Sequence, residues 1–260
     1  MYLVDLNSDL GEAFGRYSLG RDEEVLSFIT SANIACGFHA SDPDVMARTV
    51  GFAVNEDVRI GAHPGMPDLQ GFGRRELKVS PAEAKNLVTY QLGALEGFLR
   101  KHRVKLQHVK PHGALYNMAA KDRTLSEAIC EAVKEFDPEL ILMGLAGSEL
   151  VKAAEEAGLN YANEFFSDRA YEEDGSLVSR NKAGAMVTDE DEAIRRVIRA
   201  VREKKVTAIT GKDISITADS ICIHGDGAKA LEFASRIRQA LIDSEIRVVS
   251  LAEVVASRGV

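Results

Sequence analysis

The chain alternates short apolar runs with longer stretches in which apolar residues recur at spacings of three and four. Runs of the first kind are typical of buried β-strands, and stretches of the second kind are typical of amphipathic helices. Because the two alternate from end to end, we expect a parallel sheet joined by right-handed crossovers. The strands are expected at residues 2–9, 33–36, 58–62, 106–110, 140–145, 161–165, 214–216, 220–224 and 247–250.

A single (β/α) barrel of seven or eight parallel strands, extending over residues 1–260, fits this pattern and the length of 260 residues. An open doubly wound sheet is the alternative, but no GxGxxG motif follows the first strand to indicate a dinucleotide site. The sequence contains no internal repeat, low-complexity segment or linker. We therefore expect one domain, with reactive side chains at the carboxyl ends of its strands.

Composition narrows the classes of function. The net charge of −8, without a tract of Lys or Arg, disfavours nucleic acid as a partner. No apolar run approaches the roughly 18 residues of a membrane span, and the N-terminus shows no targeting segment. Three widely spaced cysteines without a CxxC motif argue against a disulfide framework. We expect a cytoplasmic protein, since that compartment keeps thiols reduced.

Three polar residues share one face of the first predicted strand. Side chains alternate along a strand, so Asp5, Asn7 and Asp9 lie on the same side. Three such groups are unfavourable in an apolar core and suit a polar pocket. Carboxylates at a strand end can hold a metal, orient an imidazole or act as a general base. The alternative is that they fix loop backbone near the barrel mouth.

Two histidines follow neighbouring strand-like runs, each beside Gly or Pro. His39 and His63 are therefore expected to converge at one edge of the sheet, where Asp68 is a candidate to orient one of them. Structural histidines are the alternative. Cys36, three residues before His39, is a weak candidate for a thiolate nucleophile, because buried cysteines are usually inert.

A lysine and a histidine share a face at the end of the fourth predicted strand. Lys110 and His112 are two residues apart. A lysine that points into a barrel needs a carboxylate, a phosphate or an anionic substrate to neutralise it. An internal ion pair with Asp5 or Asp9 is the structural alternative, and both interpretations are compatible with a site floor.

The longest irregular stretch covers residues 167–189. A loop of this length in a compact domain often serves as a lid. Arg169, Tyr171 and Arg180 within it are candidates to clamp an anion, with ordinary surface solvation as the alternative. Glu164, at the end of the preceding strand, is a candidate base.

A glycine-rich segment follows the strand expected at residues 220–224. His224 and Asp226 lie in the sequence HGDG, whose backbone N–H groups could cradle an anion, although an ordinary helix start explains it too. Several other motifs are missing from the sequence. It has no GxxxxGK[ST], no HExxH and no GxSxG, which excludes a P-loop and argues against zincin and α/β-hydrolase sites.

Six blocks of sequence together resemble the LamB/YcsF family. They are DLNSDLGEAFG, SANIACGFHASDP, GAHPGMPDLQGFGRREL, VKPHGALYN, EFFSDRAYEEDGSLVSR and CIHGDG. The blocks occur in order and cover nearly the whole chain. The resemblance implies a (β/α) barrel related to the glycoside hydrolase/deacetylase group of folds, in agreement with the strand pattern.

The resemblance also implies a reaction. It is the opening of the 5-oxoproline (pyroglutamate) lactam to L-glutamate, coupled to hydrolysis of ATP to ADP and phosphate. ATP would be a co-substrate, with Mg²⁺ as its companion ion, and the chain would act as the A component of the enzyme beside two partner subunits, B and C. Whether the chain binds a metal itself or forms a homo-oligomer stays open.

The polar positions that match the family fall into two groups. We expect catalytic roles for Asp9, His39, His63, Lys110 and His112. We expect substrate binding by Asp5, Asn7, Glu12, Asn33, Asp68, Glu164, Arg169, Arg180, His224 and Asp226. In this hypothesis Lys110 and Arg169 neutralise a carboxylate or phosphate, and Asp9 or one of the two paired histidines activates water.

Two other functions stay open. Fold-level analogy with carbohydrate deacetylases suggests a metal site of Asp9, His63 and His112 in a hydrolase of a small or carbohydrate substrate. A non-catalytic scaffold that only completes the B and C subunits is the third hypothesis. The cluster of polar residues at strand ends argues against a scaffold.

Overall fold

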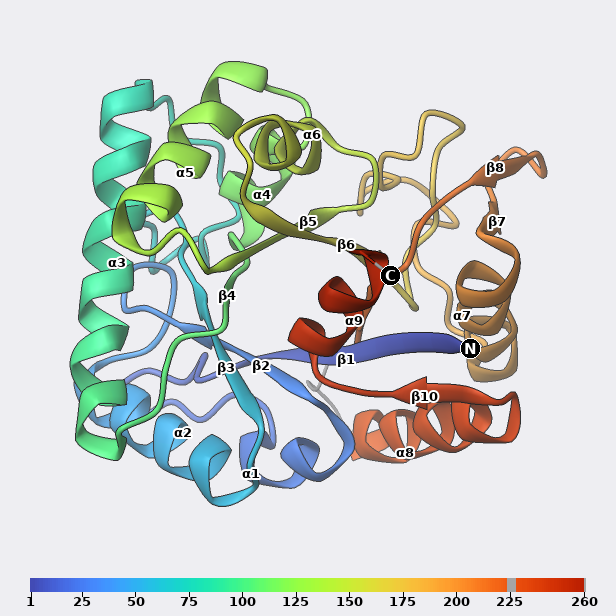
Figure 1. Ribbon diagram of the computed structural model, residues 1–260, viewed down its shortest axis with the longest axis horizontal. Helices are drawn as coiled ribbons and strands as arrows, with labels where there is room; N and C mark the ends of the chain where they lie inside the picture. Colours follow the sequence, from blue (N-terminus) through green and yellow to red (C-terminus); the bar gives the residue numbers. More distant parts are fainter. Residues whose placement is uncertain (224–227, 260) are drawn as a thin grey trace.

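Seven parallel strands close into a barrel in the computed structural model, which describes residues 1–223 and 228–259 (Figure 1). The ring closes because β9 pairs with β6 on one side and with β1 on the other. This confirms the predicted (β/α) barrel. Its strands are β1 (Tyr2–Leu10), β2 (Ser31–Ala35), β3 (Arg59–His63), β4 (His108–Val109), β5 (Ile141–Leu145), β6 (Asn160–Phe166) and β9 (Ser220–Cys222).

An eighth strand in the same sheet extends the barrel at one end without entering the ring. β10 (Ile246–Val248) pairs in parallel with the start of β1, where Tyr2 lies opposite Ile246. Farther along, β1 exchanges this neighbour for β9, with Asp5 opposite Ser220. The first strand of the chain is thus held by two segments that come from its end. Both the start and the later part of the chain therefore contribute strands to the same sheet.

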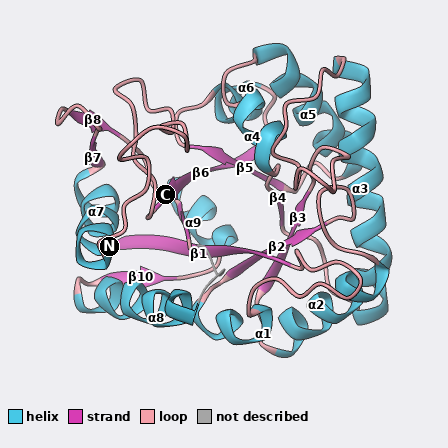
Figure 2. Cartoon of the chain, turned by 180° about the vertical axis from the view of Figure 1, so that it is seen from behind, coloured by secondary structure: helices cyan, strands magenta, loops and turns pink. Residues whose placement is uncertain are grey.

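Most helices surround the ring of strands on the outside, whereas α9 (Leu251–Ala256) lies across the opening of the ring, where Leu251 packs with Ile141 and Met143 of β5 (Figures 1 and 2). Their starts follow the expected chemistry: Ser80 and Glu83 form a reciprocal capping box at the longest helix, with Pro81 in its first turn. The helices are α2 (Pro43–Asn55), α3 (Pro81–His102), α5 (Arg123–Phe136), α6 (Glu149–Glu156), α7 (Glu190–Glu203), α8 (Ala228–Asp243) and α9 (Leu251–Ala256).

Local structure differs from the sequence pattern in places. Residues 22–28 form a short helix, α1 (Asp22–Val25), followed by a 3₁₀ turn, Leu26–Phe28. An unpredicted helix, α4 (Gly113–Ala119), follows β4 directly, because Gly113 turns the chain at a φ of +54°. The segment expected as a barrel strand at 214–216 instead belongs to an antiparallel pair, β7 (Lys205–Thr207) and β8 (Asp213–Ser215), outside the barrel.

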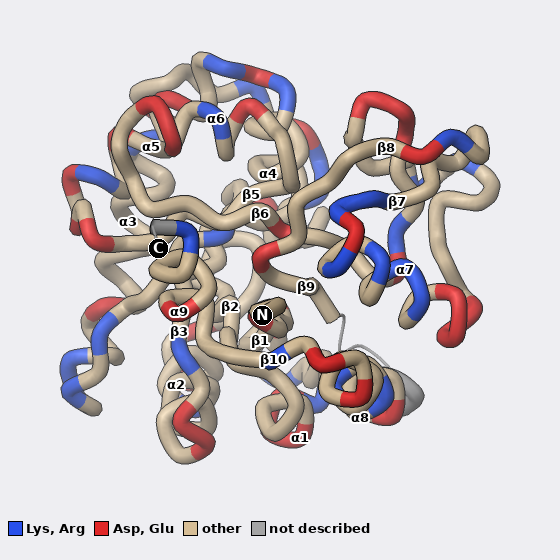
Figure 3. The backbone as a smooth tube through the Cα atoms, turned by 45° about the vertical axis from the view of Figure 1, so that its right-hand side comes forward, with Lys and Arg blue, Asp and Glu red and all other residues tan. Residues whose placement is uncertain are grey.

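The barrel interior is polar at the carboxyl end of β1. Asp5 and Asn7 are fully buried and point inward, as alternation along the strand predicted. Charged residues of both signs are interspersed along the tube of the chain (Figure 3). In the described part of the chain, no helix combines the length and apolarity that crossing a membrane requires.

Candidate functional site

A buried lysine lies at the centre of the site floor. Lys110 Nζ lies 2.8 Å from Asp9 Oδ1, 2.6 Å from Glu164 Oε1 and 3.1 Å from Asn7 Oδ1. These residues come from β1, β6 and the end of β4, which the barrel brings together at one edge. Burial by itself lowers the pKa of Lys110, but Asp9, Cys222 and Glu164 outweigh it and hold that pKa well above its usual value. Lys110 therefore stays charged.

Asn33 fixes the Asp9 carboxylate from the neighbouring strand. Its amide Nδ2 donates to Asn7 Oδ1 and Asp9 Oδ1, both at 2.8 Å, and its Oδ1 accepts from His108 Nε2 at 2.7 Å. Burial and the Lys110 charge lower the pKa of His108 to about 3, so this imidazole is neutral. Sequence reasoning missed His108, although it lies on the same strand face as Lys110.

Asp5 lies below this layer and outside the cavity. Its carboxylate accepts hydrogen bonds from the hydroxyls of Thr30, Ser31 and Ser220. Burial raises its pKa to about 6, against the opposing effect of these hydrogen bonds. Asp5 thus organises the barrel interior, and it does not reach the cavity where we predicted it would bind substrate.

Asp5→Asn should remove a pH dependence of stability. The folded-state pKa of Asp5 is raised from 3.8 to about 6, so its contribution is fully present below pH 4 and is lost as pH rises through 6. The free energy of unfolding of the wild type, relative to Asp5→Asn, should fall by about 3 kcal/mol between these limits. Urea unfolding at pH 4 to 7 measures it, and a constant difference would contradict the assignment.

Two histidines face each other across the cavity floor. His63 Nδ1 donates to the Lys110 carbonyl at 2.7 Å, which leaves its Nε2 with a lone pair. His112 Nε2 donates to the Phe72 carbonyl at 2.9 Å, which leaves its Nδ1 with a lone pair. These two atoms lie 3.0 Å apart. Asp9 Oδ2 lies 3.4 Å from His63 Nε2.

A third imidazole stacks on this pair. The His39 ring lies parallel to the His112 ring, with centroids 3.6 Å apart. His39 is completely buried, and neither ring nitrogen has a hydrogen-bond partner among the described residues. Its Nε2 lies 3.4 Å from Glu12 Oε1, and His112 Nδ1 lies 3.5 Å from the same oxygen. The histidine cluster of Glu12, His39, His63 and His112 brings potential metal-ligand atoms within 4.8 Å of one another.

A cavity of about 900 Å³ opens above the lysine and the histidine cluster. Asp9, Glu12, His63, Lys110 and His112 form part of its floor. The wall contains Arg74, Tyr116 and residues 172 and 174–180 from the long loop. The role of this loop as a lid stays a prediction.

Two arginines of the long loop, Arg169 and Arg180, line the cavity. Arg169 is nearly buried; its Nη2 donates to the Val178 carbonyl at 2.6 Å, and its Nε has no hydrogen-bond partner within the described part of the chain. Burial and the neighbouring Arg180 lower the pKa of Arg169. A buried guanidinium with an unused donor beside a second arginine favours an anionic ligand.

Comparison with known proteins decides the family. The model of the LamB/YcsF family matches residues 4–256. The chain belongs to the LamB/YcsF family. A protein from Clostridium beijerinckii that is named as the A subunit of 5-oxoprolinase is 62% identical to it, covering 98% of this chain and 100% of that protein. Proteins of the same name from Bacillus licheniformis and Bacillus subtilis are 60% and 55% identical, covering 95% and 97% of this chain and 98% of each relative.

A solved structure supports the fold of this LamB/YcsF chain. The lactam utilization protein from Thermus thermophilus is 45% identical, and it superposes with a TM-score of 0.90. The match covers 95% of this chain and 99% of that one. The barrel is therefore shared along nearly the whole length.

Three predicted roles in the LamB/YcsF site do not fit the structure. Asp68 orients no histidine among the described residues, because it pairs with Arg75 and accepts from the Gly71 N–H, which fixes its own loop. The Tyr171 hydroxyl accepts from the Phe166 N–H inside the protein and cannot clamp a ligand. Burial raises the pKa of Cys36 to about 12, which removes it as a nucleophile.

The other predicted site residues lie in different parts of the structure. The lysine floor and the histidine cluster unite all five residues predicted to be catalytic. Glu164 is fully buried, and its Oε2 accepts from the Tyr116 hydroxyl at 2.7 Å, so it stabilises the floor. His224 and Asp226 lie outside the described residues.

Glycines shape the wall behind His39, and Gly73→Ala should disrupt it. Gly73 has a φ of +61°, and a Cβ there would lie 2.6 Å from His39 Cβ and 3.0 Å from His112 Cδ2. We expect a loss of about 2–4 kcal/mol of unfolding free energy, because strain adds to overpacking. Gly15→Ala is the matched control: its φ is +55°, with no described atom within 4 Å of the Cβ. Equal losses in urea unfolding would contradict the close contact.

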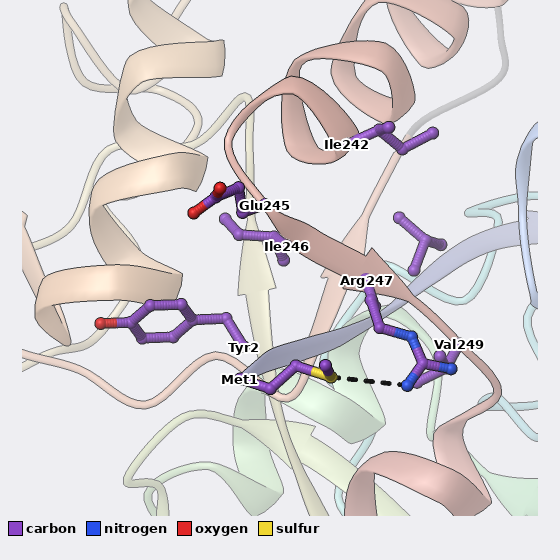
Figure 4. A pocket seen from close by; sticks show the side chains of 8 residues that line it. Met1, Tyr2, Ile242, Glu245, Ile246, Arg247 and Val249 are labelled. Carbon is purple, nitrogen blue, oxygen red and sulfur yellow. Dashed lines mark hydrogen bonds between the residues drawn. The ribbon is translucent and has the colours of Figure 1, made fainter.

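A second pocket, of about 730 Å³, lies at the opposite end of β1. Met1, Tyr2, Ile246 and Arg247 contribute to its lining, and Arg247 Nη1 lies 3.5 Å from Met1 Sδ (Figure 4). Its described lining brings no group of metal-ligating or nucleophilic side chains together. The candidate site is therefore the cavity at the carboxyl end.

Proposed function

We propose that this chain is the A subunit of an ATP-dependent 5-oxoprolinase, which converts 5-oxo-L-proline and water to L-glutamate while ATP is hydrolysed to ADP and phosphate. The observation that carries the proposal is the shared name of relatives that are 55–62% identical over nearly the full length of this chain. The name of the Thermus thermophilus protein, which refers to lactams, supports the same substrate class.

ATP has a physical role in this reaction. A lactam carbonyl is a poor electrophile, and its nitrogen is a poor leaving group. Transfer of the γ-phosphoryl group to the lactam oxygen releases ADP and gives an imidate-like carbon. Water then adds to that carbon, and the ring C–N bond breaks as the nitrogen takes up a proton, which leaves an acyl phosphate of glutamate. A second water attacks this acyl phosphate and releases phosphate and the free carboxylate. The site must therefore bind an anion and activate water.

The cavity contains residues suited to both tasks. Lys110 is already neutralised by Asp9 and Glu164, so we assign the incoming carboxylate or phosphate to Arg169 rather than to Lys110. Asp9 is the candidate base: Lys110 and Asn33 hold its Oδ1, and its Oδ2 lies beside His63. Lys110 and Asn33 stabilise the ionised form of Asp9 and fix the position of its carboxylate. Asp9 can therefore accept a proton from a correctly placed water.

Arg169→Lys should raise KM for the anionic substrate about 10-fold with a smaller change in kcat. Lysine keeps the positive charge but lacks the second N–H donor of the planar guanidinium. A charge-assisted hydrogen bond from such a donor contributes about 1.5–3 kcal/mol. Steady-state kinetics of the assembled enzyme, with 5-oxoproline and ATP varied in turn, identifies the ligand. Arg100→Lys, on the exposed side of α3, is the control. An unchanged KM for both substrates would remove Arg169 from the binding site.

The proposed function is tested by ATP-dependent release of glutamate from 5-oxoproline. The assay is run with this chain alone and then with its B and C partners. We expect turnover only in the full set. A folded preparation that gives no glutamate in any combination would overturn the proposal.

A second candidate is metal-dependent hydrolysis without nucleotide. The facing lone pairs of His63 and His112 favour it over a non-catalytic scaffold, because a scaffold gains nothing from burying such a pair. The same glutamate assay without ATP, with Zn²⁺ or Mn²⁺ supplied, distinguishes the two reactions. Turnover that needs ATP excludes the second candidate.

A further inference from the structure

The two facing nitrogens of His63 and His112 require a positive species between or beside them. Each imidazole already donates its one N–H to a backbone carbonyl, so both atoms at the 3.0 Å contact carry lone pairs. Two lone pairs at this distance repel. Carboxylates lie against the pair on both sides, Asp9 Oδ2 at 3.4 Å and Glu12 Oε1 at 3.5 Å. The surroundings favour a cation.

A shared proton explains only part of this arrangement. It would satisfy the contact between His63 and His112. It would leave His39 unexplained, since His39 is fully buried and neither of its nitrogens has a hydrogen-bond partner in the described ranges 1–223 and 228–259. The Nε2 of His39 lies 3.4 Å from the same Glu12 oxygen that approaches His112. Three imidazoles and a carboxylate thus converge on one volume.

Several separations in the cluster lie near the spacing of ligands around a metal ion. At the tetrahedral angle, two ligand atoms bound to one Zn²⁺ at about 2.0–2.2 Å lie about 3.3–3.6 Å apart. Glu12 Oε1 lies 3.4 Å and 3.5 Å from the nearest nitrogens of His39 and His112, the facing nitrogens of His63 and His112 lie 3.0 Å apart, and all four ligand atoms lie within 4.8 Å of one another. We propose that Glu12, His39, His63 and His112 form a binding site for one divalent transition-metal cation.

The surroundings of the cluster fit a metal site. The carbonyls of Lys110 and Phe72 fix the tautomers of His63 and His112, which is the usual way that proteins orient metal-bound histidines. The nitrogen-rich donor set favours Zn²⁺, Co²⁺ or Ni²⁺ over Mg²⁺. Asp9 lies at the edge of the site, so this set shares only His63 and His112 with the set that the fold analogy suggested. Glu12, His63 and His112 line the cavity, which gives an ion a route of entry.

Metal binding by the isolated full-length chain tests the site without any need for turnover. The chain is stripped with a chelator, loaded with Zn²⁺, dialysed, and analysed for metal by mass spectrometry. Co²⁺ then serves as a spectroscopic probe, since nitrogen ligation in a site of low symmetry gives visible d–d absorption. We expect one equivalent per chain and a Co²⁺ spectrum that Zn²⁺ abolishes. A folded chain that retains no metal and gives no such spectrum would overturn the proposal.

Variants separate this site from adventitious binding. His63→Gln should lose the bound equivalent, and Glu12→Gln, at a partly exposed position where folding is less at risk, should weaken Zn²⁺ affinity at least 10-fold. His102→Gln, at the end of α3 and outside the cluster, is the matched control and should keep full binding. Equal retention by Glu12→Gln and the control would show binding elsewhere. Because 5-oxoprolinase turnover is not measured, the outcome is independent of the proposed function.

Discussion

Lys110→Met should destabilise the chain by about 3–5 kcal/mol, the loss expected when one partner of a buried ionic cluster is removed. Lys110 is nearly fully buried, and its ammonium holds Asp9 and Glu164 together on the barrel floor. Without it, two carboxylates lie close together in a low dielectric with no opposing charge. Chemical denaturation at pH 7, with the urea midpoint and slope both recorded, measures the loss.

Two further variants test whether the loss in Lys110→Met comes from the buried charges. Lys85→Met removes a partly exposed lysine that bridges Glu131 and Glu135 on the outer helices, and it should cost less than about 1 kcal/mol. The double variant Lys110→Met/Glu164→Gln should be more stable than Lys110→Met alone, because it removes one of the stranded charges. If Lys110→Met and Lys85→Met lowered the free energy of unfolding equally, the charges of the floor would not be what holds it together.

Asp9→Asn should lower kcat of the assembled 5-oxoprolinase by about 10²–10⁴-fold, the range that general bases contribute. Asparagine is isosteric, and its amide oxygen can still accept from Lys110 and Asn33, which hold the carboxylate now. It cannot take a proton from water. The loss should therefore appear in kcat, with KM for 5-oxoproline nearly unchanged.

The control for this experiment is a carboxylate far from the cavity. Asp243→Asn, at the exposed end of α8, should leave kcat unchanged. Thermal unfolding of both variants checks that the barrel is intact. If Asp9→Asn turned over at the wild-type rate, water activation would have to be assigned to the histidine cluster.

Alternation along strands made much of the site predictable. A period of two placed Asp5, Asn7 and Asp9 inside the barrel and Lys110 beside His112, and the parallel topology then brought β1 and the end of β4 together. The same rule would have found His108, two residues before Lys110. It was missed because no Gly or Pro flanks it.

Contacts between distant loops were not predictable from local pattern. The tautomer of His112 depends on the Phe72 carbonyl, 40 positions away, and Asp68 found a partner in Arg75 within its own loop. The turn into α4 depends on a positive φ at Gly113, which the sequence permits without requiring. Such details follow from tertiary packing, which periodicity does not encode.

The closure of the barrel has a consequence for synthesis of the protein. Asp5 in β1 receives one of its hydrogen bonds from Ser220, 215 positions later, and β9 and β10 complete the strand pairing of β1. At translation rates of roughly 5–20 residues per second, β1 waits on the order of 10–40 s for these partners. Throughout that interval a nascent chain exposes one unpaired edge of β1 together with its polar inner face. The barrel is therefore a high-contact-order fold that closes only after the ribosome has added β9 and β10, and chains truncated before these strands lack the partners that cover this edge.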